Sequence, residues 1–147
     1  MPWKTTLKRA KKDKQEGKAA STQAGEFVRE EMEHIRRGKH GAKSTKQAIA
    51  IGLSKARRAG VDLKPPKKGR ASEKTRKTAE RDYSKGHSAK KKSASPRRSR
   101  ARLKALKHEP RSAASHAALS RQAKSAARRR KRSGPATAGS RTHKKAA

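Results

Sequence analysis

The strongest structural signal in the chain is residues 44–59, Ser-Thr-Lys-Gln-Ala-Ile-Ala-Ile-Gly-Leu-Ser-Lys-Ala-Arg-Arg-Ala. Ile49 and Leu53 are four residues apart, and this spacing continues on one side of the stretch, which predicts an amphipathic helix. Ser44 and Gln47 have the spacing of a capping box, in which each side chain bonds the other residue's free backbone N–H. The stretch therefore predicts a helix with a defined start and one apolar face.

A second helix is predicted directly before it, over about residues 23–37. Val28, Met32 and Ile35 follow one another at spacings of four and three, so they share one helix face. Thr22 precedes this pattern and is a suitable N-cap residue. These features predict a partner helix whose apolar face can pack against the first.

The two helices are predicted to form an αα-hairpin. The connection, residues 38–43, is short enough to make the helices antiparallel neighbours, and Gly38 suits the left-handed position after a helix. Gly52 interrupts the second helix, which indicates a close helix–helix contact there. The predicted hairpin core consists of Phe27, Val28, Met32, Ile35, Ile49, Leu53 and Val61. So small a core predicts marginal stability, or pairing with a second copy or a partner.

Composition predicts little order outside this hairpin. The 147 residues include 45 Lys or Arg and 11 Asp or Glu, for a net charge of +34. Leu, Ile, Val and Phe make up only about 8% of the chain, and highly charged sequences below ~20% are expected to be disordered. The expected fold class is therefore mostly disordered, with a small all-α module of two short helices and a long basic tail. The expected segments are a basic arm (1–20), the hairpin (21–63), a mixed-charge linker (64–82) and the tail (83–147).

The tail carries the most one-sided charge. Residues 83–147 contain 21 Lys or Arg and a single acid, Glu109. Residues 97–109 and 112–131 are rich in good helix formers, but repulsion among the cations opposes helix formation. We therefore expect these segments to fold into helix only when phosphates neutralise them.

The sequence offers no pattern typical of an enzyme. Cysteine is absent, and the six histidines never stand three or four residues apart, so they are interpreted as scattered, solvent-exposed imidazoles. Glu30, Glu31 and Glu33 suit ion pairs with neighbouring arginines. We expect no catalytic residues, cofactor, metal or small-molecule substrate. The sequence also shows no apolar run of membrane-spanning or signal-peptide length, so we expect a cytoplasmic protein.

Clusters of basic residues predict a polyanionic partner. Each cluster places several positive charges within reach of adjacent phosphates, where counterion release drives binding that is largely indifferent to sequence. Only three aromatic residues are available for base stacking, which favours duplex DNA over single-stranded nucleic acid. The expected contacts are Lys90, Lys91, Lys92, Arg97, Arg98, Arg100, Arg102, Arg128, Arg129, Arg130, Lys131 and Arg132.

Two resemblances to known proteins also favour DNA binding. Residues 95–98, Ser-Pro-Arg-Arg, and the Ala/Lys/Arg/Ser/Pro composition of the tail resemble linker-histone tails and histone-like basic proteins of bacteria. Residues 34–41, His-Ile-Arg-Arg-Gly-Lys-His-Gly, together with residues 44–54, are similar to a family of small bacterial proteins without an established function. Members of that family are sometimes labelled DNA-binding or plasmid-stabilisation proteins. The resemblance covers about residues 25–65 and implies a bacterial origin and a short helical module.

Three functions remain open on the sequence. The first is a sequence-nonspecific, histone-like DNA-binding protein associated with the nucleoid. The second is an RNA- or ribosome-associated basic protein. The third is a partner-docking or plasmid-maintenance module built on the hairpin, which could also form a homodimer.

Overall fold

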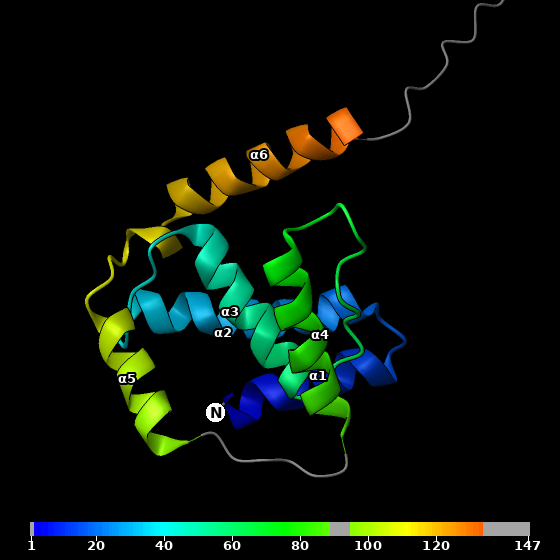
Figure 1. Ribbon diagram of the computed structural model, residues 1–147, viewed down its shortest axis with the longest axis horizontal. Helices are drawn as coiled ribbons and strands as arrows, with labels where there is room; N and C mark the ends of the chain where they lie inside the picture. The colour runs from blue at the N-terminus through cyan, green and yellow to red at the C-terminus, as the bar shows by residue number, and fades with distance from the viewer. Residues whose placement is uncertain (1, 89–94, 134–147) are drawn as a thin grey trace, which may run out of the picture.

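The predicted hairpin lies at the centre of the structure. The computed structural model describes residues 2–88 and 95–133 and contains the two expected helices, α2 (Ala20–Arg36) and α3 (Thr45–Arg58) (Figure 1). Ala48, near the start of α3, shares a buried cluster with Ile35, near the end of α2. Ala56, near the end of α3, shares another cluster with Ala24, near the start of α2, so the two helices run in opposite directions. Helices α2 and α3 therefore pack as an antiparallel pair, within a larger helical fold.

The ends of these helices follow their capping chemistry in most respects. The Ser44 hydroxyl accepts a hydrogen bond from the Gln47 N–H at 3.2 Å, while Gln47 Oε1 accepts from the Lys43 N–H and not from Ser44. Gly38 has φ +71°, as a glycine that ends a helix requires. The predicted start of α2 is wrong, because the helix begins before Thr22, where packing of Ala20 and Ala24 against the core extends it by a turn.

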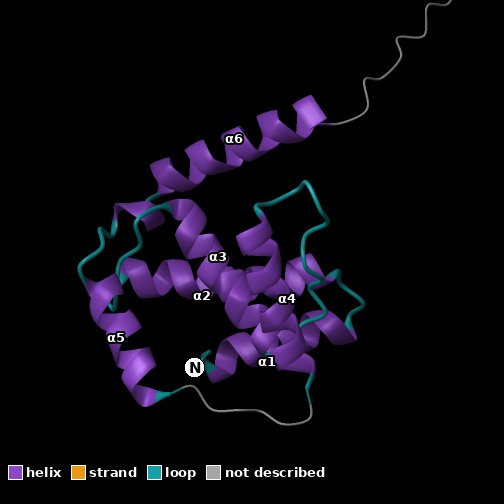
Figure 2. Cartoon of the chain, viewed as in Figure 1, coloured by secondary structure: helices purple, strands orange, loops and turns teal. Residues whose placement is uncertain are grey.

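Within residues 2–88 and 95–133 the structure contains four α-helices besides α2 and α3, and the expectation of a mostly disordered chain with a two-helix module is wrong. Figure 2 shows that helix predominates in the described residues. The elements beyond the hairpin are α1 (Lys4–Gln15), α4 (Glu73–His87), α5 (Pro96–Lys107), the short 3-10 helix η1 (Ser112–Ala114) and α6 (His116–Ser133). Helix α1 packs on α2, α4 packs on α3, and η1 packs on both α2 and α3.

The core is built largely from alanine. This explains why the low content of Leu, Ile, Val and Phe gave a wrong expectation of disorder. Eight of the twelve buried apolar residues among those described are alanines. Alanine is the best helix former and lets helix backbones approach closely, so little Leu or Ile is needed to fill the space between them. One cluster contains Met32, Ile35, Ala42, Ala48, Ala113 and Ala114; the other contains Ala10, Ala24, Phe27, Ala56 and Val61.

The residues of the predicted hairpin core differ in how deeply they are buried. Phe27, Met32, Ile35 and Val61 are buried. The other three predicted residues are half-buried and pack against the two clusters: Val28, Ile49 and Leu53. The apolar seam is therefore covered within one chain, by elements that the sequence analysis placed in an arm, a linker and a tail.

Helix α4 is fixed to α3 by polar contacts as well as by packing. The buried carboxylate of Asp82 accepts hydrogen bonds from Ser54 Oγ at 2.6 Å and from Arg58 Nε at 3.0 Å. Gly86 lies so close to the Arg57 carbonyl that any side chain would collide with it. This docking begins inside the segment expected to be a linker and continues into the one expected to be a disordered tail.

A group of polar side chains is also buried, beside the loop between α2 and α3. Glu30, Glu31, His34 and His40 are each at most 8% exposed. The expectation that the histidines are solvent-exposed is wrong for His34 and His40, because Gly38 turns the chain and brings the loop back onto α2.

Among residues 2–88 and 95–133, the helices are too short or too polar to cross a lipid bilayer.

Candidate nucleic-acid interface

Helix α6 is anchored at its N-terminal end by the preceding 3-10 helix. Ala113 and Ala114 are buried between α2 and α3, and their carbonyls accept hydrogen bonds from Thr45 Oγ1 at 2.7 Å and Arg36 Nε at 2.9 Å. Leu119, in the first turn of α6, packs against the same cluster. The anchor thus fixes where α6 leaves the body of the protein.

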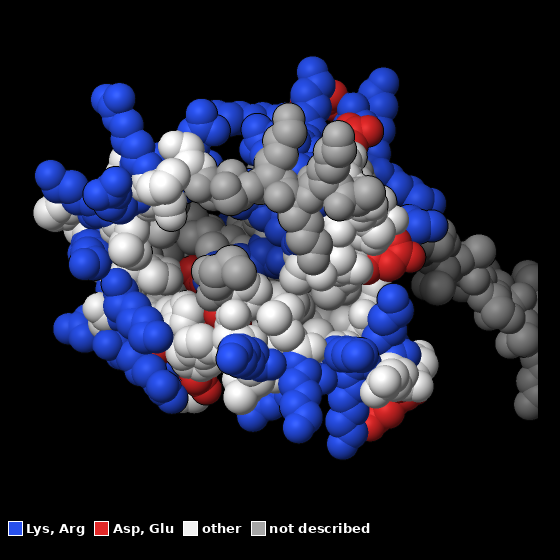
Figure 3. All heavy atoms as spheres, turned by 90° about the horizontal axis from the view of Figure 1, so that it is seen from below, with Lys and Arg blue, Asp and Glu red and all other residues white. Residues whose placement is uncertain are grey.

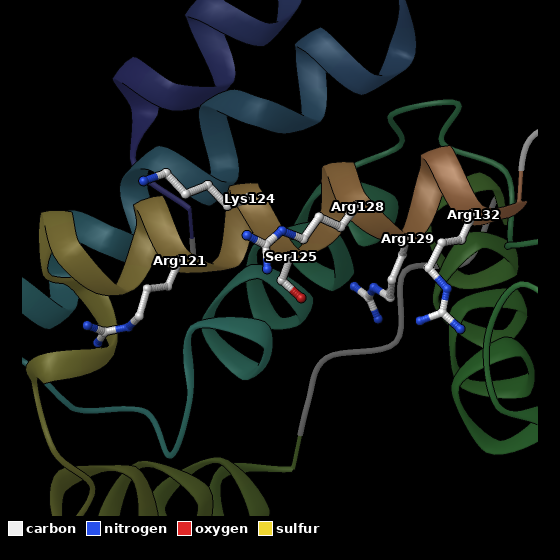
Figure 4. Close-up of a pocket in the computed structure, with 6 residues that line it drawn as sticks. All are labelled: Arg121, Lys124, Ser125, Arg128, Arg129 and Arg132. Carbon is white, nitrogen blue, oxygen red and sulfur yellow. The ribbon is translucent and has the colours of Figure 1, made fainter.

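The remainder of α6 presents a stripe of basic side chains. Arg121, Lys124, Arg128 and Arg132 follow one another at spacings of three, four and four, which places them on one helix face. All four are exposed, and with Ser125 and Arg129 they line a shallow hollow along α6 (Figure 4). We call Arg121, Lys124, Arg128 and Arg132 the α6 stripe.

Helix α5 adds a second basic element. It is held to the body through the loop between α2 and α3, since the Gly41 N–H donates to the Leu106 carbonyl at 2.8 Å and the Ala42 N–H donates to the Pro110 carbonyl at 3.0 Å. All its basic side chains are exposed: Arg97, Arg98, Arg100, Arg102, Lys104 and Lys107. The chain therefore presents two basic helices that are joined by one anchored segment.

The two halves of the chain differ in how many acidic residues accompany their Lys and Arg. Ten of the 11 acids precede residue 83, and several pair with neighbouring cations, such as Glu31 with Lys55 and Asp82 with Arg58. Within residues 2–88 and 95–133, the four members of the α6 stripe form no ion pair with an acid. Figure 3, which views the molecule from the side away from α6, shows Lys and Arg mainly toward the edges of that face, with a few Asp and Glu among them. The positive potential of α6 is thus not neutralised by neighbouring carboxylates.

The predicted contact residues fall into three groups. Arg97, Arg98, Arg100 and Arg102 lie on α5, and residues 128–132 lie on α6, all of them exposed. Lys90, Lys91 and Lys92 fall outside the residues that the structure describes.

Two members of the α6 stripe and the segment that anchors it were not predicted from the sequence. Arg121 and Lys124 stand alone and not in runs of adjacent cations, so only their helical spacing to Arg128 indicates that they belong to one basic face. The anchor, residues 112–114, consists of small residues that carry no apolar periodicity.

Comparison with known proteins identifies only the central part of the chain. No curated protein and no solved structure matches the chain. The stretch from the end of α1 through α2 and α3 to the loop before α4, residues 14–69, matches a family described as a family of unknown function (DUF6496).

Proposed function

We propose that this protein binds duplex DNA without sequence preference, through phosphate contacts of α5 and α6, as a histone-like, nucleoid-associated protein. The observation that carries the proposal is the α6 stripe, four exposed cations on one helix face with no acidic partner in the described part of the chain. Such a stripe gains free energy by releasing counterions from a polyanion. The proposed role is that of a binding protein in the bacterial cytoplasm, not of an enzyme.

The dimensions of the stripe suit a duplex. Arg121 and Arg132 are eleven positions apart, which corresponds to about 16 Å along a helix axis. The major groove of B-DNA is about 12 Å wide and admits a helix, whose long side chains then reach the phosphates on either side. Arginine also contacts phosphate oxygens in pairs. The stripe consists only of Arg and Lys, whose charges suit phosphates of any sequence, so we expect contacts that position the protein on the backbone.

The aromatic residues favour a duplex over single-stranded RNA. Phe27 is buried in the core, the Trp3 ring lies edge-on against His34, and Tyr83 stacks on His87. All three aromatic rings of the chain are thus engaged internally. Proteins that bind single strands use exposed aromatic rings as stacking platforms.

The experiment compares the salt dependence of DNA binding in two matched variants. In the first, the α6 stripe is replaced by glutamine: Arg121→Gln, Lys124→Gln, Arg128→Gln and Arg132→Gln. In the second, four exposed α1 residues with similar helical spacing are replaced: Lys4→Gln, Lys8→Gln, Lys11→Gln and Lys14→Gln. Within the described residues, the ion pairs of α1 involve Arg9 and Lys12 and not these four. Both variants lose four positive charges, so net charge alone cannot distinguish them.

We expect the α6 variant to lower the slope of log affinity against log salt by up to about 3.6, because each lost phosphate contact removes about 0.9. The α1 variant should change the slope by less than about one contact's worth. Random and defined duplexes should bind within a few-fold of each other. Equal losses in both variants, a thousandfold preference for one sequence, or tighter binding to single-stranded RNA than to duplex DNA would each contradict the proposal.

A further inference from the structure

A second chemical feature lies beside the loop between α2 and α3. Glu31, His34 and His40 each offer a ligating atom, and these atoms all lie within 4.8 Å of one another. Glu30 lies beside them, with its Oε1 atom 3.8 Å from His34 Nε2. We infer that this cluster binds a divalent transition-metal ion, with Zn²⁺ as the expected occupant.

Several atoms of the cluster lack the partners that buried polar atoms require. Glu30 Oε1, Glu31 Oε1 and His34 Nε2 are inaccessible to solvent and form no hydrogen bond. Leaving a buried polar group unpaired costs about 1–3 kcal/mol, and more for a charged group. Glu30 Oε1 faces His34 Nε2 at 3.8 Å, and Glu31 Oε1 faces His40 Nε2 at 3.2 Å. Buried polar atoms without hydrogen-bond partners are expected where a cation completes the site.

Two of these side chains bond a neighbouring group through the polar atom that does not face the cluster. Metal-binding side chains are usually oriented by such outer contacts. Lys55 Nζ lies 2.5 Å from Glu31 Oε2, which leaves Oε1 to face the cluster. His40 Nδ1 lies 3.0 Å from the Gly41 carbonyl, and this contact requires the proton on Nδ1 because a carbonyl only accepts. In the neutral imidazole, the lone pair of His40 Nε2 is then directed toward Glu31 Oε1, 3.2 Å away. A cation between two such acceptors turns a repulsion into two bonds.

The donor set fits zinc better than the hard cations. Two imidazole nitrogens with carboxylate oxygens are a usual zinc set, whereas Mg²⁺ and Ca²⁺ prefer oxygen ligands only. With neutral histidines, Glu30, Glu31 and Lys55 leave one net negative charge, which a divalent ion would reverse. Ligand atoms around tetrahedral Zn²⁺ are about 3.3 Å apart. The candidate ligand atoms lie within 4.8 Å of one another, so each pair needs to approach by at most about 1.5 Å.

Trp3 closes the cluster. Its backbone N–H donates to Glu30 Oε2 at 3.0 Å, and its ring lies against His34 with centroids 4.6 Å apart. The cluster thus joins the N-terminus, α2 and the loop that carries Gly41, which in turn holds α5. A metal here would be structural, and its binding does not depend on the proposed DNA contacts.

The test uses the full-length chain with Zn²⁺ and Co²⁺ as probes. Calorimetry should show one Zn²⁺ bound per chain, and Co²⁺ should give the visible absorption bands of a four-coordinate nitrogen and oxygen site. Trp3 is the only tryptophan, so quenching of its fluorescence by Co²⁺ would place the ion next to it. His34→Gln and His40→Gln should each weaken Zn²⁺ affinity by more than tenfold.

The matched control is His87→Gln, which changes an exposed histidine outside the cluster and should leave Zn²⁺ affinity unchanged. The spectroscopic result on the unmodified chain keeps the test decisive if a variant fails to fold. A chain that binds no Zn²⁺ would overturn the inference and leave the cluster as an internal ion-pair network. Equal losses from His87→Gln and His34→Gln would also overturn it, because binding would then reside on scattered surface histidines.

Discussion

Gly52 of α3 lies directly against the backbone of Val28 in α2, where a Cβ atom at Gly52 would approach the Val28 Cα to 2.7 Å. The two helices can be this close only because residue 52 has no side chain. The interruption of a helical pattern by glycine, which costs about 1 kcal/mol in a helix, is thus explained by packing.

Gly52→Ala should destabilise the protein although alanine is the better helix former. The new methyl group collides with backbone, which cannot rotate away, so we expect a loss of about 1–3 kcal/mol. Gly25→Ala in α2 is the control, because its Cβ would meet nothing within 4 Å, and it should stabilise by roughly 0.5–1 kcal/mol. Urea unfolding measures both. A neutral Gly52→Ala would mean that the helices separate freely.

Ala114→Asp should release α6 from the body. Ala114 is fully buried among the apolar residues of the first cluster, and a carboxylate there would be desolvated without a partner. Hydrogen exchange in residues 112–133 should become fast, while the centres of α2 and α3 stay protected. Ala123→Asp introduces the same charge at an exposed position of α6 and should leave the protection unchanged. Equal protection in both variants would show that η1 is not the anchor.

Asp82→Asn should weaken the docking of α4. The buried Asp82 carboxylate accepts hydrogen bonds from Ser54 and Arg58, and hydrogen bonds to charged groups contribute about 1.5–3 kcal/mol. Glu80→Gln on the same helix removes an exposed carboxylate whose Arg76 contact is 3.9 Å long, and it should cost at most about 0.5 kcal/mol. Thermal unfolding compares the two; similar losses would mean that Asp82 acts only as surface charge.

Tyr83 should titrate above its ordinary range. Its hydroxyl donates to Asp62 at 2.5 Å, and this hydrogen bond raises the pKa of Tyr83 above 10.0 and lowers the pKa of Asp62 below 3.8. The contact therefore stabilises the fold at pH values between the pKa of Asp62 and the pKa of Tyr83. Its contribution is lost as pH rises through the raised Tyr83 pKa, or falls through the lowered Asp62 pKa.

Because Tyr83 is the only tyrosine, absorbance of the phenolate reports its titration directly. Asp62→Asn should return the pKa of Tyr83 toward 10, whereas Glu80→Gln should not move it. An unchanged titration in Asp62→Asn would show that the hydrogen bond does not form in solution.

The sequence by itself determined the αα-hairpin, because local chemistry is sufficient for it. Apolar spacing, the hydroxyl of Ser44 and the glycines after each helix act within a few residues, and all reappear in the structure. The basic character of α5 and α6 was equally visible, since charge is a property of composition.

Only the tertiary structure decided that the rest of the described chain is ordered. Small residues such as Ala113, Ala114 and Gly41 carry no apolar periodicity, and their value appears only when another backbone lies within contact distance. The same holds for the Glu31, His34 and His40 cluster. A search for histidine pairs along one helix could not find it, because His40 reaches the site only after Gly38 reverses the chain. Long-range packing of small residues, and not local propensity, is what turns this basic sequence into a folded protein.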